Sequence, residues 1–151
     1  MHLKELLNEN LIIVDLKSQD KWKTIEDLVD VLIKAQEVNS QDKNELLESL
    51  YEREQKMTTG IEHGVAIPHA ASEVVKQLTA VFGICKSGLD FQAIDGQPTY
   101  LIVLLVYPQR ALHEHIRTLA SIANLLNDEA IRTKLKACKS SVEALQIIQQ
   151  E

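Results

Sequence analysis

The chain has 151 residues, of which 45% are hydrophobic and 25% are charged, and its formal net charge is −6. This length and balance predict one globular domain with a sizeable core over residues 1–151. The acidic balance argues against nucleic acid, whose phosphates need a basic surface, and no apolar run is long enough to cross a membrane, so we expect a cytoplasmic protein without direct membrane insertion.

The N-terminal third alternates between a strand-like and a helix-like pattern. The short β-branched run at 11–14 predicts a strand, and apolar side chains share one helical face over 22–32, with Ser18 as the candidate N-cap. A second amphipathic helix is predicted to start after Asn39 and to end near Lys56.

The middle of the chain predicts a structured loop followed by strands. Residues 57–71 lose the helical period and contain two glycines and one proline. The apolar runs 78–85 and 100–107 have strand length, and the second is so continuously apolar that both its faces should be covered. A turn at Ser87–Gly88 is predicted to lead into a further short strand over 89–94.

The C-terminal third predicts three helices. After Pro108, apolar residues recur at helical spacing: Leu112, Ile116, Leu119, Ile122, Ala123 and Leu126. A short helix is expected over 129–137, and a last helix opens on a capping box from Ser140 to Glu143 and should bury Val142, Leu145 and Ile148. The alternation of strands and helices predicts an α/β fold with a mixed central β-sheet and helices on both faces.

The step Ile67-Pro68-His69 is the strongest candidate for chemistry. Proline fixes its own φ and pushes the preceding Ile67 towards extended geometry, so the backbone that carries His69 has few alternatives. A neutral imidazole can accept a phosphoryl group on one ring nitrogen if the other nitrogen is held as a donor. We therefore predict His69 as a phosphoryl carrier.

Residues around the loop can supply donors for the two negative charges that a phosphoryl group adds. Thr58 and Thr59 bring hydroxyls, Gly60 and Gly64 allow close approach of backbone N–H groups, and Arg53 on the preceding helix brings a guanidinium fork. The spacing alone does not establish that these groups converge.

A second histidine is of interest on the helix after Pro108. His115 falls in line with Leu119 and Ile122 on the predicted buried stripe, whereas His113 falls on the solvated face. An inward histidine at this place can donate a hydrogen bond to a phosphoryl oxygen.

Three motifs then identify a family. They are Arg53-Glu54 before the loop, Thr-Thr-Gly and Ala-Ile-Pro-His-Ala within residues 58–70, and His-Ile-Arg-Thr-Leu-Ala at 115–120. Together they resemble the active-site signature of the fructose/mannitol-type enzyme IIA domains of the bacterial sugar phosphotransferase system. Length and element order also fit, so the resemblance covers nearly the whole chain.

The resemblance implies a mannitol-type enzyme IIA fold, with His69 phosphorylated and His115 and Arg53 in support. It implies HPr, a phosphohistidine carrier protein, as donor, and either a cysteine of an enzyme IIB domain or, in the nitrogen-regulatory branch, a regulatory target protein as partner. The resemblance does not separate these two branches. In both, the chain is expected to be a phosphotransferase without a cofactor.

Two alternatives remain open at the level of sequence. One is a regulatory module that binds proteins independently of phosphorylation. The other is a metal site built from His63, His69, His113 and His115, which is less favoured because the last two project about 200° apart on a helix. No carboxylate or thiolate clearly completes such a ligand set.

Overall fold

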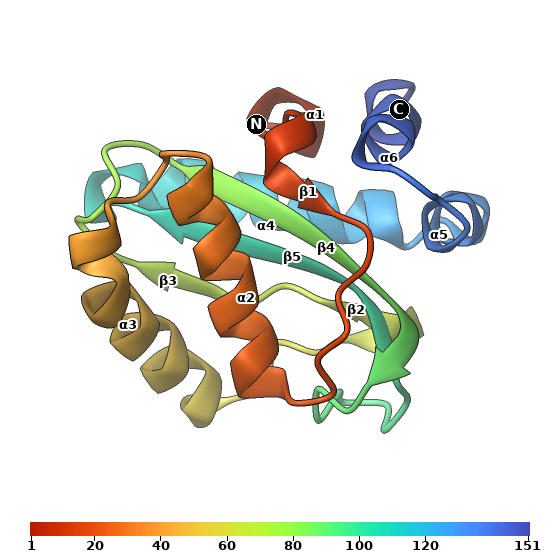
Figure 1. The fold of residues 1–151 in the computed structure, drawn as a ribbon, viewed down its shortest axis with the longest axis horizontal. Helices are drawn as coiled ribbons and strands as arrows, with labels where there is room; N and C mark the ends of the chain where they lie inside the picture. Colours follow the sequence, from red (N-terminus) through yellow and green to blue (C-terminus); the bar gives the residue numbers. More distant parts are fainter.

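Two long central strands and three short ones form one mixed sheet in the computed structural model, which describes all 151 residues (Figure 1). The strands are β1 (Ile12–Ile13), β2 (Val65–Ala66), β3 (His69–Ala71), β4 (Thr79–Leu89) and β5 (Thr99–Tyr107). The order is β1-β4-β5-β2, with β3 also paired to β5. β4 and β5 are antiparallel and the remaining pairs are parallel, so the predicted mixed sheet is confirmed.

Helices cover both faces of this sheet. They are α1 (Leu3–Leu6), α2 (Lys21–Lys34), α3 (Lys43–Lys56), α4 (Leu112–Leu126), α5 (Glu129–Lys136) and α6 (Ser141–Gln149). Figure 1 shows α2 and α3 in front of the sheet and α4 behind it, with α1 and α6 close to the two chain ends. The longer helices start and end close to the predicted limits. No helix combines the length and the apolar character that crossing a membrane requires.

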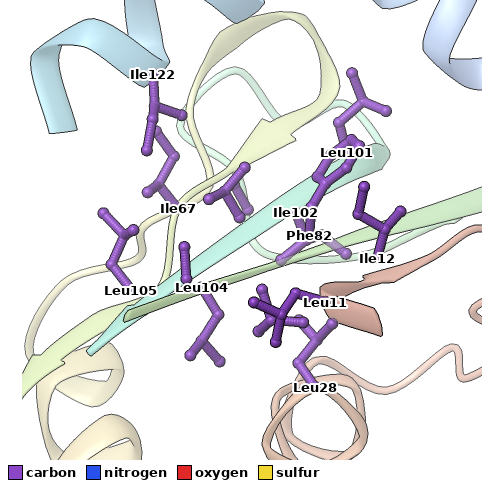
Figure 2. Close-up of a cluster of buried hydrophobic side chains, with 14 of the residues drawn as sticks. Leu11, Ile12, Leu28, Ile67, Phe82, Leu101, Ile102, Leu104, Leu105 and Ile122 are labelled. Carbon is purple, nitrogen blue, oxygen red and sulfur yellow. The ribbon is translucent and has the colours of Figure 1, made fainter. Parts of the chain in front are cut away.

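The core lies on both sides of β5, as its continuous apolar run predicts. Its residues from Leu101 to Val106 are fully buried. Figure 2 shows Ile67 and Ile122 packed on one side of the central strands and Leu11 and Leu28 on the other. Each such side chain contributes roughly 1.5–3 kcal/mol by leaving water, so burial anchors β5 in the core, where it pairs with the short strands β2 and β3.

The predicted turn at Ser87–Gly88 and the separate strand over 89–94 are wrong. β4 continues to Leu89, and its pairing with β5 shifts register between Ile84 and Leu89. Gly88 adopts a φ of 75° inside this irregularity. Glycine is favourable both in turns and in bulges, so the local sequence does not distinguish the two.

Helix ends and helix faces also differ in detail from prediction. Asp20, not Ser18, caps α2, because its carboxylate accepts a hydrogen bond from the Trp22 N–H at 3.1 Å. Val142, predicted to be buried, is 46% exposed, and Ile116, one of the apolar residues at helical spacing, is 53% exposed. Each helix buries only the narrow stripe that meets its neighbours, and the spacing of apolar residues overestimates its width.

Candidate functional site

His69 lies on β3, a three-residue strand inside the segment predicted as a loop. It pairs with Leu105 in the parallel register of β3 and β5, and the Leu105 N–H donates to the Pro68 carbonyl at 2.9 Å. Strands of two or three residues are too short to produce an alternating pattern, which explains why the sequence predicted only a structured loop. The rigid central strand therefore holds the backbone under His69.

The backbone carbonyl of Ile67 orients the His69 ring. Its Nδ1 lies 2.8 Å from the Ile67 carbonyl oxygen. A carbonyl only accepts hydrogen bonds, so Nδ1 carries the proton and Nε2 keeps its lone pair. Burial lowers the pKa of His69 below its ordinary value, opposed by the Ile67 hydrogen bond and assisted by the positive charge of Arg53. The neutral, nucleophilic form therefore dominates at neutral pH.

His115 on α4 (Leu112–Leu126) lies next to His69. The two ring centroids are 5.0 Å apart, and His115 stacks on Tyr107 at 3.9 Å with an interplanar angle of 12°. His115 is only 3% exposed, and its Nδ1 has no hydrogen-bond partner. Burial, together with the nearby His69, lowers the pKa of His115 to about 4.

His115 Nδ1 is one of three buried side-chain polar atoms without a hydrogen-bond partner, and the other two are the hydroxyl oxygens of Thr99 and Thr118. A buried polar atom without a partner costs roughly 1–3 kcal/mol, and such atoms are rare in native structures. The prediction that His115 faces inward is confirmed, whereas His113 is exposed.

A cleft of about 270 Å³ opens beside His69. Its lining residues are Ser49, Glu52, Arg53, Lys56, His69, Ala70, Ala71 and Tyr107. Arg53 lies at the end of α3, where its Nη1 donates to the Met57 carbonyl at 2.8 Å. Burial raises the pKa of Tyr107, and the positive charge of Arg53 opposes this shift only in part. For His69, burial and the Arg53 charge both lower the pKa. The tertiary structure thus brings Arg53 and the two histidines to one place.

Thr58 and Thr59 support the loop and do not line this cleft. The Thr58 hydroxyl donates to the Phe91 carbonyl at 2.9 Å and accepts from the Gly60 N–H at 3.1 Å. The Thr59 hydroxyl donates to a Glu54 carboxylate oxygen at 2.6 Å. Both hydroxyls therefore already have partners inside the protein.

His63 lies outside the cleft beside His69. It is exposed, adopts a φ of 66°, and borders a different hollow that contains Ile61 and Ile94. No group of three or more histidine, cysteine, aspartate or glutamate side chains is arranged to hold a metal ion. The arrangement gives no support to the metal-site alternative.

Sequence reasoning missed two features of the site. Tyr107 is the last residue of an apolar run and gave no sign of its stacking on His115. Lys21 is buried and forms an ion pair with Glu54 at 2.8 Å, although a lysine in the first turn of a helix is typically solvated. Only the Arg-Glu motif hinted at Glu54, and nothing in the local pattern identified Lys21.

The chain is similar to proteins of one family in sequence and in structure. Residues 5–151 match the family described as phosphoenolpyruvate-dependent sugar phosphotransferase system, EIIA 2. The fructose-specific EIIABC component of Bacillus subtilis is 34% identical over 99% of this chain, which spans only 23% of that protein's length.

Two solved structures are similar over nearly the whole chain. Nitrogen regulatory protein IIA-Ntr of Neisseria meningitidis has a TM-score of 0.87 and 31% identity, with 97% of this chain and 98% of that chain covered. Enzyme IIAMTL of Escherichia coli, in its complex with phosphorylated enzyme IIBMTL, has a TM-score of 0.81 and 22% identity over 96% and 98% of the two chains, and supports the fold.

These similarities confirm the mannitol-type enzyme IIA fold and the resemblance drawn from the three motifs. EIIA domains are phosphotransferase components. With a matched region that extends over nearly all of its length, the chain belongs to the EIIA type 2 family of the phosphoenolpyruvate-dependent sugar phosphotransferase system.

Proposed function

We propose that this chain is a phosphohistidine phosphocarrier that accepts a phosphoryl group on Nε2 of His69 and passes it to a protein partner. The observation that carries the proposal is the hydrogen bond from Nδ1 to the Ile67 carbonyl, which leaves Nε2 as the free nucleophile. The family supplies HPr, the phosphohistidine carrier protein, as the donor.

The reaction is a reversible exchange of one bond to phosphorus. The lone pair of His69 Nε2 attacks the phosphorus of the donor's phosphohistidine, and the donor's N–P bond breaks as the new one forms. In the next step a cysteine thiolate of an acceptor attacks the same phosphorus, and the bond to His69 breaks. Neither step requires a metal or cofactor on this chain.

Arg53 and His115 stabilise the charge on the transferred group. The phosphoryl group brings about two negative charges at neutral pH. Arg53 offers guanidinium donors at the cleft, and the His115 ring lies close to His69, with the two ring centroids 5.0 Å apart. A dianion close to His115 raises the pKa of its imidazole, so phosphorylation favours the charged form of His115 and a stronger hydrogen bond.

The acceptor is an enzyme IIB domain or a regulatory target. Enzyme IIAMTL forms a complex with phosphorylated enzyme IIBMTL, while IIA-Ntr is a nitrogen regulatory protein, and this chain is similar to both. We propose that residues 1–151 act as one cytoplasmic domain in either role. A binding module independent of phosphorylation has no observation in its favour, because both histidines and Arg53 are in place.

Intact-protein mass spectrometry tests the carrier function. Wild type is incubated with phosphoenolpyruvate, enzyme I and HPr, and we expect one acid-labile addition of about 80 Da, as for a single phosphohistidine. His69→Ala should remain unlabelled, while the exposed His113→Ala serves as the matched control and should be labelled normally. An unlabelled wild type with a competent donor would refute the proposal, and a labelled His69→Ala would place the phosphoryl group elsewhere.

A further inference from the structure

A buried ion pair joins two helices below the site. Lys21 at the start of α2 and Glu54 near the end of α3 are 2.8 Å apart, and their side chains are only 4% and 1% exposed. Buried ion pairs contribute little net stability, because the desolvation of two charges offsets their attraction. Net stability alone therefore does not account for the Lys21–Glu54 pair.

Glu54 holds the start of the loop that leads to His69. One carboxylate oxygen accepts from the Thr59 N–H at 2.8 Å, and the other accepts from the Thr59 hydroxyl at 2.6 Å. Lys21 binds the same region, since its Nζ donates to the Thr58 hydroxyl at 3.4 Å and to the Gln92 side-chain oxygen at 3.2 Å. The ion pair thus fixes both threonines relative to α2 and α3.

A continuous set of hydrogen bonds leads from Thr59 to the His69 ring. The Thr59 carbonyl accepts from the Ile67 N–H at 3.1 Å. The carbonyl of the same Ile67 residue accepts from His69 Nδ1 at 2.8 Å. The Lys21–Glu54 pair is therefore linked through two residues to the group that selects the tautomer of His69.

We infer that Lys21 is a positioning residue for His69, acting through Glu54, Thr59 and the Ile67 carbonyl to keep the ring proton on Nδ1 and the lone pair on Nε2. This inference rests on the proposed carrier function. An in-line attack requires a well-placed nucleophile, and a misplacement of about 1 Å can reduce a rate about 100-fold. Lys21 touches neither the phosphoryl group nor the cleft.

The variants separate the positioning role from folding. Lys21→Met alone leaves the Glu54 charge buried without a counter-charge, which is expected to unfold part of the population. The double variant Lys21→Met/Glu54→Gln removes both charges together and should fold. Thr59→Val keeps the ion pair but removes the hydroxyl contact to Glu54. Lys23→Met, an exposed lysine on the same helix, is the matched control.

Two measurements are made on each folded variant. Nitrogen NMR of the unphosphorylated protein reports which His69 nitrogen is protonated, and initial rates of transfer from phospho-HPr report kcat and KM. In wild type and Lys23→Met we expect the proton on Nδ1. In the double variant we expect a mixture of both tautomers, with kcat reduced about tenfold and KM for the donor changed by less than about twofold. Thr59→Val should shift the tautomer mixture and kcat in the same direction as the double variant, but by less.

The outcomes distinguish this inference from the carrier function. A folded double variant with the wild-type tautomer and wild-type kcat would overturn the role of Lys21. A mixture of tautomers in the double variant supports the positioning role of Lys21. This holds even if the wild-type protein takes no label, because the NMR measurement needs no phosphoryl transfer. Should the double variant fail to fold, the same two readouts on Thr59→Val decide, and wild-type values there would refute the linkage.

Discussion

His69 and His115 are the same residue type, with ring centroids 5.0 Å apart, but they lie in different environments. His69 lies on a short strand, half-buried beside an open cleft, with one ring nitrogen held by a backbone carbonyl. His115 lies on a helix, buried against Tyr107, with an unpartnered Nδ1. Under the proposed function this difference is a division of labour, in which the strand presents a nucleophile and the helix presents a donor.

The pKa values of both histidines lie below their ordinary value. Both imidazoles are kept neutral mainly by burial. Under the proposed function, the neutral form of His69 provides the attacking lone pair, whereas the neutral form of His115 avoids a buried positive charge in the unphosphorylated protein.

The largest expected effect is that His115 cannot replace His69. In His69→Gln we expect complete loss of phosphoryl incorporation, with no label on His115, because the buried ring offers no accessible nucleophile. Labelling followed by peptide mapping checks this result. Label found on His115 would contradict the division of labour between strand and helix.

His115→Phe is expected to make the protein slower but more stable. Loss of one donor to the developing charge typically reduces kcat about 100-fold or more. Removing an unpartnered buried nitrogen should raise the free energy of unfolding by about 1 kcal/mol. Transfer kinetics and urea denaturation measure the two effects, and an unchanged kcat would remove His115 from the chemistry.

The acid sensitivity of folding should depend on His115. Its pKa is about 4 in the folded protein and ordinarily 6.5, so between these values the unfolded chain binds more protons. The free energy of unfolding therefore falls as pH drops from 6.5 towards 4, by up to about 3 kcal/mol from this residue, at about 1.4 kcal/mol per pKa unit. The stability advantage of His115→Phe should grow over the same range. A constant difference between the two proteins, measured by denaturation at several pH values, would be inconsistent with this.

Arg53→Lys should show that a point charge does not replace the guanidinium fork. We expect transfer to slow about tenfold, because Lys cannot bind the Met57 carbonyl and a phosphoryl oxygen with the same rigid geometry. Steady-state kinetics with phospho-HPr measure the change. Glu52→Gln, which alters a neighbouring cleft residue, is the control and should have a smaller effect.

The smallest effect is expected from Tyr107. Tyr107→Phe keeps the stacked ring and should transfer phosphoryl groups within about twofold of wild type, whereas Tyr107→Leu loses the aromatic stacking, which is worth roughly 0.5–1.5 kcal/mol, and should slow transfer severalfold. The same kinetic assay compares them. Equal rates for the two variants would mean that the stacking does not orient His115.

Sequence predicted the site best where chemistry depends on neighbours along the chain. Proline before His69 and the inward register of His115 on its helix are local features, and the structure brings the two rings to a centroid distance of 5.0 Å. The part played by Tyr107 was not predicted, because its contact with His115 joins the end of β5 to the next helix. The bulge at Gly88 was read as a turn because local residue preferences are shared by both structures.

The amino-acid order alone determined the α/β class, the helices with a long apolar period and the identity of the family, because these depend on periodicity and on short motifs. Tertiary structure alone decided that Ile67 orients His69, that His115 is buried against Tyr107, and that Lys21 lies buried against Glu54. Those contacts join residues from separate helices, strands and loops. Their geometry is set by how the helices pack on β4 and β5, for which no local pattern carries a signal.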